Sequence, residues 1–343
     1  MFRSARFVTW APVATVLTDA LVWACSNDTS DVVDVTEPTM AEVHASPPLV
    51  PTDANLKVAF IGDTGTGSDF KKVLQLIKRE GADLIMVQGD LNYGFLGSAG
   101  PWFSAADGEL RGEIPYFLAK GNHDTDWSRF GNGMKTRLQG LGVTPAGDPV
   151  SANYAVEYRG LQIVMVSDSE TSPSRADFIK QRFATDNHAW RICSWHKNQR
   201  ASNIGPKDDE MGWATYEACR TAGAIVAQGH SHTYSRSRTL TNDTTQTVDP
   251  SCKDPFDLCV GAGRHFFFDS SVGGQDLRSP TTSIASRPYW GSTFTGAFGA
   301  LFIEFNVDGD PNKARGYFKT TEDRVVDPPA SSGRSSFTIY RTN

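Results

Sequence analysis

The sequence predicts an α/β domain in which two mixed β-sheets stack between helices, as a four-layer α/β/β/α sandwich. Two observations support this prediction. From residue 57 onward, short apolar runs typical of strands alternate with stretches of helical periodicity. After residue 260 the chain turns largely to strand-like runs separated by Gly, Pro and Asp. A two-sheet core with helices outside accommodates both halves of the pattern.

The first unit of this domain is a strand, a helix and a second strand. Phe70, Leu74 and Ile77 fall on one helical face, and Ser68 stands where an N-cap residue is expected. The order strand–helix–strand predicts a parallel pair of strands joined by a right-handed crossover. The expected bounds are 56–63 and 83–90 for the strands and 68–81 for the helix.

The later elements follow from the same rules. A run with strand character turns at Arg159-Gly160 and predicts a hairpin over residues 153–169. Further strands are expected at 115–124, 190–197, 224–232, 264–272, 299–307, 314–320 and 336–340, further helices at 172–186 and 212–223, and loops at 94–112, 197–210 and 241–296.

The first 25 residues have the pattern of an export signal. Arg3 and Arg6 supply a positive start, and an apolar stretch from Phe7 to Ala24 ends in a small residue before Cys25. The end of this stretch, "VWAC", resembles the site at which bacterial lipoproteins are cut and lipidated. The protein is therefore expected to be exported and to be periplasmic, secreted, or held at the cell surface as a lipoprotein through Cys25. Plain signal cleavage without lipidation and a non-specific apolar start are the alternatives.

Residues 26–54 are expected to form a disordered acidic linker. No Lys or Arg occurs in this segment, and its Asp and Glu stand among Thr, Ser and Pro. Such a segment buries too little apolar surface to offset the entropy of ordering it. The folded domain is therefore expected to span residues 55–343.

The four cysteines after Cys25 are even in number, which in an exported protein predicts two disulfides. Cys252 and Cys259 flank a short loop and are expected to pair, which leaves Cys193 with Cys219. Buried free thiols are the alternative. A zinc site is disfavoured because no Cys-x-x-Cys spacing occurs.

The overall charge argues against nucleic acid as a partner. The chain has a net charge of −6 and a sequence pI of about 5.7. It has no long basic run to neutralise a phosphate backbone.

Five of the predicted strands end in side chains that can bind a metal ion. Because the carboxyl ends of parallel strands meet at one edge of a sheet, residues far apart in sequence are expected to come together there. Each motif alone is a weak signal, whereas the ordered set is a strong one. The residues are Asp63 in "GDTG", Asp90 in "GDLNY", Asn122 in "GNHD", His196 in "SWHKN", and His230 and His232 in "GHSH".

This ordered set resembles the calcineurin-like metallophosphoesterases, and within them the purple acid phosphatase branch. The resemblance spans residue 58 to about residue 236. It implies a hydrolase acting on phosphoric ester bonds of small substrates, with a dinuclear metal site at the strand ends. The two ions would be Fe(III) and a divalent ion, either Fe, Zn or Mn.

The resemblance also implies which residues hold each ion. Asp63, Asp90, Tyr93 and His232 would bind the first. Asp90, Asn122, His196 and His230 would bind the second, with Asp90 bridging the two.

Tyr93 is the residue that points to the purple acid phosphatase branch. In the wider superfamily, the position two residues after the first aspartate usually holds a histidine, and here it is Gly65. A tyrosinate at Tyr93 would supply the missing ligand, and phenolate favours Fe(III). The alternative is that Tyr93 packs as an ordinary loop aromatic.

The predicted reaction is hydrolysis of a phosphate monoester by a metal-bound hydroxide. His123 is the candidate general acid for the leaving alkoxide, and Asp124 is expected either to orient the His123 ring or to cap the following turn. A phosphodiesterase on the same dinuclear site is one alternative. The other is a non-catalytic surface binding protein with the same fold.

Overall fold

The structure, a computed structural model, describes residues 48–94, 98–169 and 173–342. The predicted export signal, including Cys25, and most of the predicted acidic linker lie outside the described residues. Within the described ranges, no helix combines the length and apolar character that crossing a membrane requires.

The end of the predicted linker packs on the folded domain. Val50 donates a backbone hydrogen bond to the carbonyl oxygen of Asn187 at 2.9 Å and accepts one from Ala189 at 3.1 Å. Thr52 is buried, and its hydroxyl donates to the carbonyl oxygen of Gly160 at 2.8 Å. Ordered structure therefore begins before the predicted boundary at residue 55.

The first of two large sheets contains eight strands from both ends of the domain. They are β1 (Leu56–Ile61), β2 (Leu84–Val87), β3 (Tyr116–Leu118), β12 (Asp257–Val260), β15 (Gly299–Phe305), β16 (Lys313–Thr320), β17 (Val325–Asp327) and β18 (Phe337–Arg341). The order is β12-β18-β16-β15-β1-β2-β3, with β17 paired to β16. Strands β1, β2 and β3 are parallel, as predicted, and β15 pairs antiparallel with β1.

The second large sheet also contains eight strands. They are β4 (Ala146–Asp148), β5 (Asn153–Tyr158), β6 (Leu161–Met165), β7 (Trp190–Ser194), β8 (Ile225–Gln228), β9 (Tyr234–Ser237), β13 (Phe267–Ser270) and β14 (Trp290–Phe294). The order is β14-β9-β13-β8-β7-β6-β5-β4, with β6, β7, β8 and β13 parallel. The predicted hairpin at Arg159-Gly160 is present as β5 and β6. A separate pair is formed by β10 (Leu240–Asn242) and β11 (Thr247–Val248).

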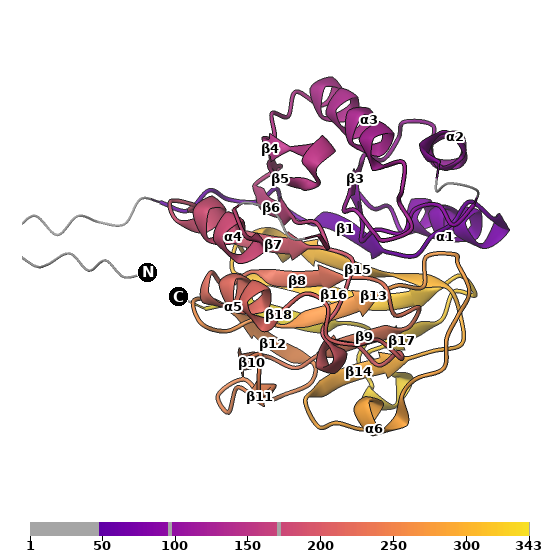
Figure 1. Cartoon of the computed structure of the whole chain (residues 1–343). Helices are drawn as coiled ribbons and strands as arrows, with labels where there is room; N and C mark the ends of the chain where they lie inside the picture. Colours follow the sequence, from indigo (N-terminus) through magenta and orange to yellow (C-terminus); the bar gives the residue numbers. More distant parts are fainter. Residues whose placement is uncertain (1–47, 95–97, 170–172, 343) are drawn as a thin grey trace, which may run out of the picture. The chain divides into compact units, whose positions relative to one another are not determined.

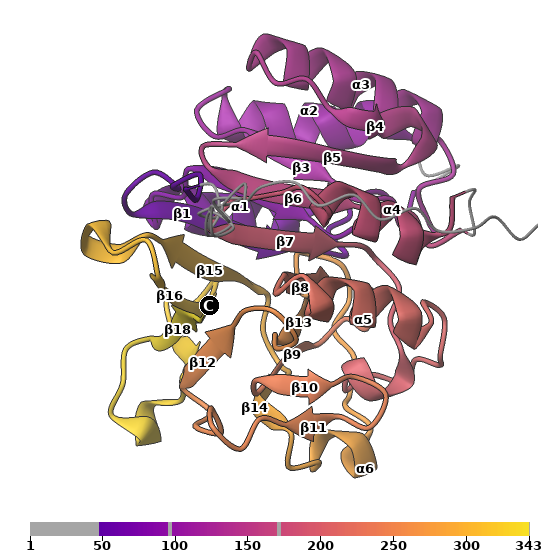
Figure 2. The same ribbon diagram turned by 90° about the vertical axis from the view of Figure 1, so that its left-hand side faces the viewer.

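The helices fall into two main groups (Figures 1 and 2). Within the residues that the structure describes, the α-helices are α1 (Ser68–Arg79), α2 (Ala99–Leu110), α3 (Trp127–Gly140), α4 (Arg175–Phe183), α5 (Trp213–Thr221) and α6 (Thr282–Ala285). Short 3₁₀ turns cover η2 (Pro149–Ser151), η3 (Arg200–Ser202), η4 (Val307–Gly309) and η5 (Ala330–Ser332). Helix α2 lies beside α1 and α3, whereas α4 packs against α5.

Three of these helices were predicted, with bounds that differ slightly. Helix α1 begins at Ser68, but its N-cap is Gly67 rather than Ser68. Helices α4 and α5 are shorter than the predicted ranges 172–186 and 212–223. Helix α3 was not predicted, and α2 and α6 lie in the ranges 94–112 and 241–296, which were expected as loops.

The two sheets pack face to face through an aromatic core. Phe60 of β1 meets Phe268 of β13 edge-on, with ring centroids 5.0 Å apart. On the outer face of the second sheet, Tyr216 of α5 contacts Phe267, the neighbour of Phe268. On the outer face of the first, Trp102 of α2 contacts Tyr116 of β3 edge-on. The predicted four-layer α/β/β/α fold is therefore confirmed.

Both predicted disulfides are present. Cys193 of β7 pairs with Cys219 of α5, and Cys252 pairs with Cys259. The first bond fastens the strand that precedes His196 to the helix that covers it. Two disulfides are typical of proteins that fold in an oxidising, extracytoplasmic compartment.

Candidate metal centre

The predicted ligand motifs meet at the carboxyl ends of parallel strands from both sheets. Three backbone hydrogen bonds join the loops: Asp63 N–H donates to Gly89 at 3.0 Å, Gly62 N–H to Ser270 at 2.9 Å, and Gly229 N–H to His196 at 3.0 Å. The second bond connects the first sheet to the second. Loops that end five strands are thus tied into one surface, which is where ligands collect in α/β folds.

Two glycines allow these loops to approach so closely. Gly89 has φ +76°, and a Cβ there would lie 2.7 Å from the backbone nitrogen of Gly121. A Cβ at Gly121 would overlap the carboxylate and backbone of Asp90. The glycines of the Gly-Asp and Gly-Asn pairs are therefore required because the loops pack closely, as well as because the backbone turns there.

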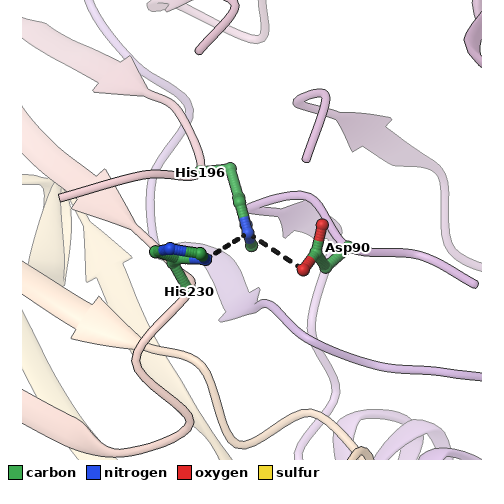
Figure 3. A group of neighbouring side chains, drawn as sticks. All are labelled: Asp90, His196 and His230. Atoms are coloured by element: carbon green, nitrogen blue, oxygen red, sulfur yellow. Dashed lines mark hydrogen bonds and ion pairs between the residues drawn. The ribbon is translucent and has the colours of Figure 1, made fainter. Parts of the chain in front are cut away.

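Asp90, His196 and His230 form one group of possible metal ligands (Figure 3). His196 Nε2 lies 3.1 Å from Asp90 Oδ2 and 3.0 Å from His230 Nδ1. One donor atom from each residue lies within 4.8 Å of the others. All three side chains are buried.

A second group shares Asp90 with the first. The Tyr93 hydroxyl lies 2.7 Å from Asp63 Oδ1, 3.0 Å from Asp90 Oδ2 and 3.3 Å from His232 Nε2. His232 Nε2 lies 3.2 Å from Asp63 Oδ1. Asp90 Oδ2 therefore belongs to both groups.

In each of the three histidines, the ring nitrogen that points away from the cluster, here called the outer nitrogen, faces an oxygen atom. His196 Nδ1 donates to the carbonyl of Gln88 at 2.7 Å, and His232 Nδ1 donates to that of Asp276 at 2.6 Å. His230 Nε2 lies 2.9 Å from Glu210 Oε2. A proton on the outer nitrogen leaves the inner nitrogen with a free lone pair, as a metal ligand requires.

The two carboxylates are also held by one oxygen each. Asp63 Oδ2 accepts a hydrogen bond from the backbone N–H of His230 at 2.7 Å. Asp90 Oδ1 accepts one from His123 N–H at 2.8 Å. In both residues the second oxygen is the one that faces the shared cluster.

The backbone at these residues is unusual. Asp63, Asp90, His230 and His232 have φ of 55°, 51°, 81° and 56°, in the left-handed region. Side chains other than glycine rarely adopt this region, and such residues gather at functional sites. Here the left-handed turn after each strand directs the side chain across the strand ends.

The pKa values of the residues in the cluster depend strongly on the charges of their neighbours. Although burial alone would raise it, the pKa of Asp90 is held well below its usual range, chiefly by the charge of His196. Burial opposes protonation of His196, but the charges of Asp90 and Asp63 raise the pKa of His196 to about 10. For Tyr93, burial and then the charges of Asp63 and Asp90 raise the pKa of the phenol.

This donor set fits metal ions. Zinc-type ions bind nitrogen and oxygen at about 2.0 Å, so the ligands of a tetrahedral site lie about 3.3 Å apart. The Tyr93, Asp63, Asp90 and His232 contacts of 2.7–3.3 Å have this spacing. A cation between them would also offset the repulsion that holds the proton on Tyr93.

The motif after β3 contributes differently from its neighbours. Asn122 is exposed, and the described contacts do not include its amide in either group. His123 is exposed as well, and its ring lies over Tyr93 with centroids 4.5 Å apart. Asn122 and His123 are therefore less enclosed than the other predicted site residues, and the His123 ring borders the cluster at Tyr93.

Asp124 connects the loop that carries Asp90 to the loop that carries Gly121, and these contacts do not orient the His123 ring. Its carboxylate accepts backbone hydrogen bonds from Asp90 at 3.1 Å, Leu91 at 2.8 Å and Gly121 at 2.7 Å. Burial and then the charge of Asp90 raise the pKa of Asp124 to about 7. None of these three contacts involves the His123 ring or the turn that follows Asp124, so they match neither expected role.

Glu210 is a functional candidate that the sequence did not reveal. It contacts His230 through one oxygen, and its other oxygen lies 2.8 Å from the ammonium of Lys197. It sits in a segment expected only as a loop, without any motif around it. The position of Glu210 beside His230 depends on the path of the loop over residues 197–212. No local sequence pattern predicts that path.

Comparison with known protein families identifies the family of this chain. A sequence profile of the calcineurin-like phosphoesterases matches residues 56–234, which is more than half of the chain. The chain belongs to the calcineurin-like phosphoesterase family. The matched range contains all the predicted ligand residues, so the cluster described above lies in the phosphoesterase domain. No curated protein sequence matches the chain.

Solved structures share the phosphoesterase fold. A purple acid phosphatase from yellow lupin (Lupinus luteus) seeds is 18% identical, with a TM-score of 0.63 over 87% of this chain and 55% of that one. PhoD is 11% identical, with a TM-score of 0.51 over 82% of this chain and 69% of that one. The chain thus spans little more than half the length of the lupin enzyme. At these identities the likeness shows a common fold.

Proposed function

We propose that this phosphoesterase hydrolyses phosphate monoesters, in the manner of an acid phosphatase, at a dinuclear metal site. The observation that carries the proposal is the pair of donor groups that share Asp90 Oδ2. A carboxylate that belongs to both donor groups could serve two adjacent cations as a common ligand. The family match supports the general class of reaction.

In this proposal each group holds one ion. Asp63, Tyr93 and His232 bind the first ion, and phenolate favours Fe(III) there. His196 and His230 bind the second, a divalent Fe, Zn or Mn ion. Asn122 completes this second site, since it directly precedes His123, whose backbone already binds Asp90.

When bound, two such ions supply a water of lowered pKa and positive charge for the phosphate oxygens. The residues of the chain do the remaining work. The His123 ring borders the cluster at Tyr93, and as an imidazolium it donates a proton to the ester oxygen that leaves. Asp124 fixes the loops of Asp90 and Gly121, so that the bridging carboxylate keeps its place.

The proposal is tested by comparing kcat/KM for 4-nitrophenyl phosphate with that for bis(4-nitrophenyl) phosphate. The protein would be loaded with iron and a divalent metal. A strong preference for the monoester is expected. A strong preference for the diester would move the function to a phosphodiesterase on the same site.

Asp90→Asn is the control for the site itself. Loss of the bridging charge should remove nearly all hydrolysis of both substrates. A fully active variant would contradict the assignment. Absence of turnover by the metal-loaded wild type would favour a non-catalytic binding protein.

We further propose that the protein is exported and, through Cys25, tethered to a membrane. The two disulfides support export, because such bonds persist outside the reducing cytosol. Mass spectrometry of the mature N-terminus tests the tether. A lipidated Cys25 is expected, whereas an N-terminus further along the chain would indicate a secreted protein.

A further inference from the structure

Two cationic side chains beside the metal-ligand cluster lack a strong partner. Lys207 is half-buried, and among the described residues its ammonium has no hydrogen-bond or ion-pair partner. The Arg278 side chain is 33% exposed, and its carboxylate neighbour is Asp276 of the same loop, at 3.9 Å. Lys197 differs, since Glu210 pairs with it at 2.8 Å.

The loops that carry Lys207 and Arg278 are fastened to the cluster. The backbone N–H of Arg278 donates to the carbonyl of His232 at 3.1 Å. The loop of Lys207 lies against Ser231, because a Cβ on Gly205 would be 2.7 Å from the Ser231 carbonyl oxygen. Both cations are therefore held at the GHSH turn by backbone contacts.

The two loops are also fastened to each other. Thr281 N–H donates to the carbonyl of Ile204 at 2.6 Å, and the Thr281 hydroxyl donates to Gly205 at 3.3 Å. Their positions relative to each other are thus built into the fold.

The two charges of this pair act on each other. Burial and then the charge of Arg278 lower the pKa of Lys207. Two like charges that are partly removed from water and held close together repel, and a bound anion relieves that repulsion.

Asp63 and Asp90 do not serve as ion-pair partners of Lys207 and Arg278 once metal ions are bound. With metal ions between them, Asp63 and Asp90 would be neutralised, and their attraction for Lys207 would be lost. An anion that arrives with the substrate is the remaining partner. Arg and Lys side chains bind phosphate through charge-assisted hydrogen bonds.

A hollow continues outward from Lys207. A cavity of about 180 Å³ is lined in part by Lys207, Thr281 and Arg200, whose guanidinium lies 3.6 Å from another lining side chain, Asp208. It shares Arg200 with a cavity of about 300 Å³ lined also by Trp213, Arg287 and Tyr289. The part of a substrate that leaves on hydrolysis would have room here, beside Lys207.

We propose that Lys207 and Arg278 form an anion subsite that binds a second phosphate group on the leaving part of the substrate. The preferred substrates are then bisphosphorylated small molecules rather than simple monoesters. This inference rests on the proposed phosphatase function. It adds the class of substrate, which the ligand cluster alone does not define.

The test compares propyl phosphate with propane-1,3-diol bisphosphate, corrected for the two equivalent phosphates of the latter. The metal-loaded wild type should have a kcat/KM at least about tenfold higher for the bisphosphate, because charge-assisted hydrogen bonds to the second phosphate strengthen binding. Lys207→Gln and Arg278→Gln should each reduce this ratio roughly tenfold, mainly through KM. Lys207→Arg should retain most of the preference.

Lys180→Gln is the matched control, because it removes one positive charge from α4, where Lys180 is 63% exposed. It should leave the ratio unchanged. If the wild type hydrolyses both esters equally, or if the variants lose activity equally on both, the subsite is wrong while the phosphatase function stands. If the metal-loaded wild type hydrolyses neither ester, the proposed function fails and the inference fails with it.

Discussion

At the scale of single residues, Tyr93 connects the sequence to the chemistry. The sequence lacks a histidine at Gly65 and has a tyrosine three residues after Asp90. The structure places the Tyr93 hydroxyl among Asp63, Asp90 and His232. A loop aromatic packed only for its apolar ring would not point its hydroxyl at two carboxylates.

Tyr93→Phe should therefore abolish the visible absorption that a tyrosinate bound to Fe(III) gives. The measurement is the absorption spectrum of iron-loaded protein, with iron content determined in parallel. Tyr317→Phe, on the distant strand β16, is the control and should keep the colour. A wild type that is colourless with iron verified in place would show that Tyr93 is not a ligand.

His123 allows a second prediction, because its exposed ring, which borders the cluster at Tyr93, suits a general acid. His123→Asn should lower kcat for an alkyl phosphate by about 10²- to 10⁴-fold. Turnover of 4-nitrophenyl phosphate should fall far less, since nitrophenolate leaves without a proton. Steady-state kinetics on both esters checks this, and an equal loss on the two would assign His123 another role.

The structure brings together the predicted site residues that lie near strand ends. Asp63, Asp90, Tyr93, His196, His230 and His232 all lie within six residues after the end of a strand, and parallel pairing brings strand ends together. Glu210, Lys207 and Arg278 lie in long loops, whose path depends on tertiary contacts such as Thr281 to Ile204. No local pattern encodes those contacts.

At the scale of elements, the missed helices have a physical explanation. Helix α2 begins with Ala-Gly-Pro, and α3 contains Gly131 and Gly133, so helix propensity argues against both. A proline is tolerated in the first turn of α2 because its missing N–H has no partner there. In α3, a Cβ on Gly131 would lie 2.6 Å from Val150, so close packing with η2 requires glycine.

The contact between α1 and β16 leads to a pH-dependent prediction. Glu80, at the C-terminus of α1, accepts hydrogen bonds from Tyr317 at 2.6 Å and Lys319 at 2.7 Å. Burial opposes the effect, but these hydrogen bonds lower the pKa of Glu80. A carboxyl whose pKa is lowered by folding stabilises the protein above its unfolded pKa of about 4.3, and this contribution disappears as pH falls through the folded pKa.

Glu80→Gln should thus lower the free energy of unfolding by about 1 kcal/mol at neutral pH. The difference from wild type should shrink as pH falls below about 4. Urea unfolding at several pH values measures it, with the exposed Glu322→Gln as control. A difference that stays constant with pH would show that the Glu80 charge is not involved.

At the scale of the whole molecule, the site exists because two sheets end at the same place. The first sheet supplies Asp63, Asp90 and Tyr93, and the second supplies the three histidines. Neither sheet alone carries a complete donor group, since each group combines Asp90 with histidines of the other sheet. The sequence predicted the two sheets and their ligands, but the shared position of Asp90 Oδ2 needed the folded structure.

The most direct test of this account is anomalous diffraction from crystals of the protein loaded with iron and a divalent metal. Two peaks are expected on either side of the Asp90 carboxylate. One should lie among Asp63, Tyr93 and His232, and the other beside His196 and His230. A single peak, or no peak within bonding distance of Asp90 in fully loaded protein, would contradict the dinuclear site.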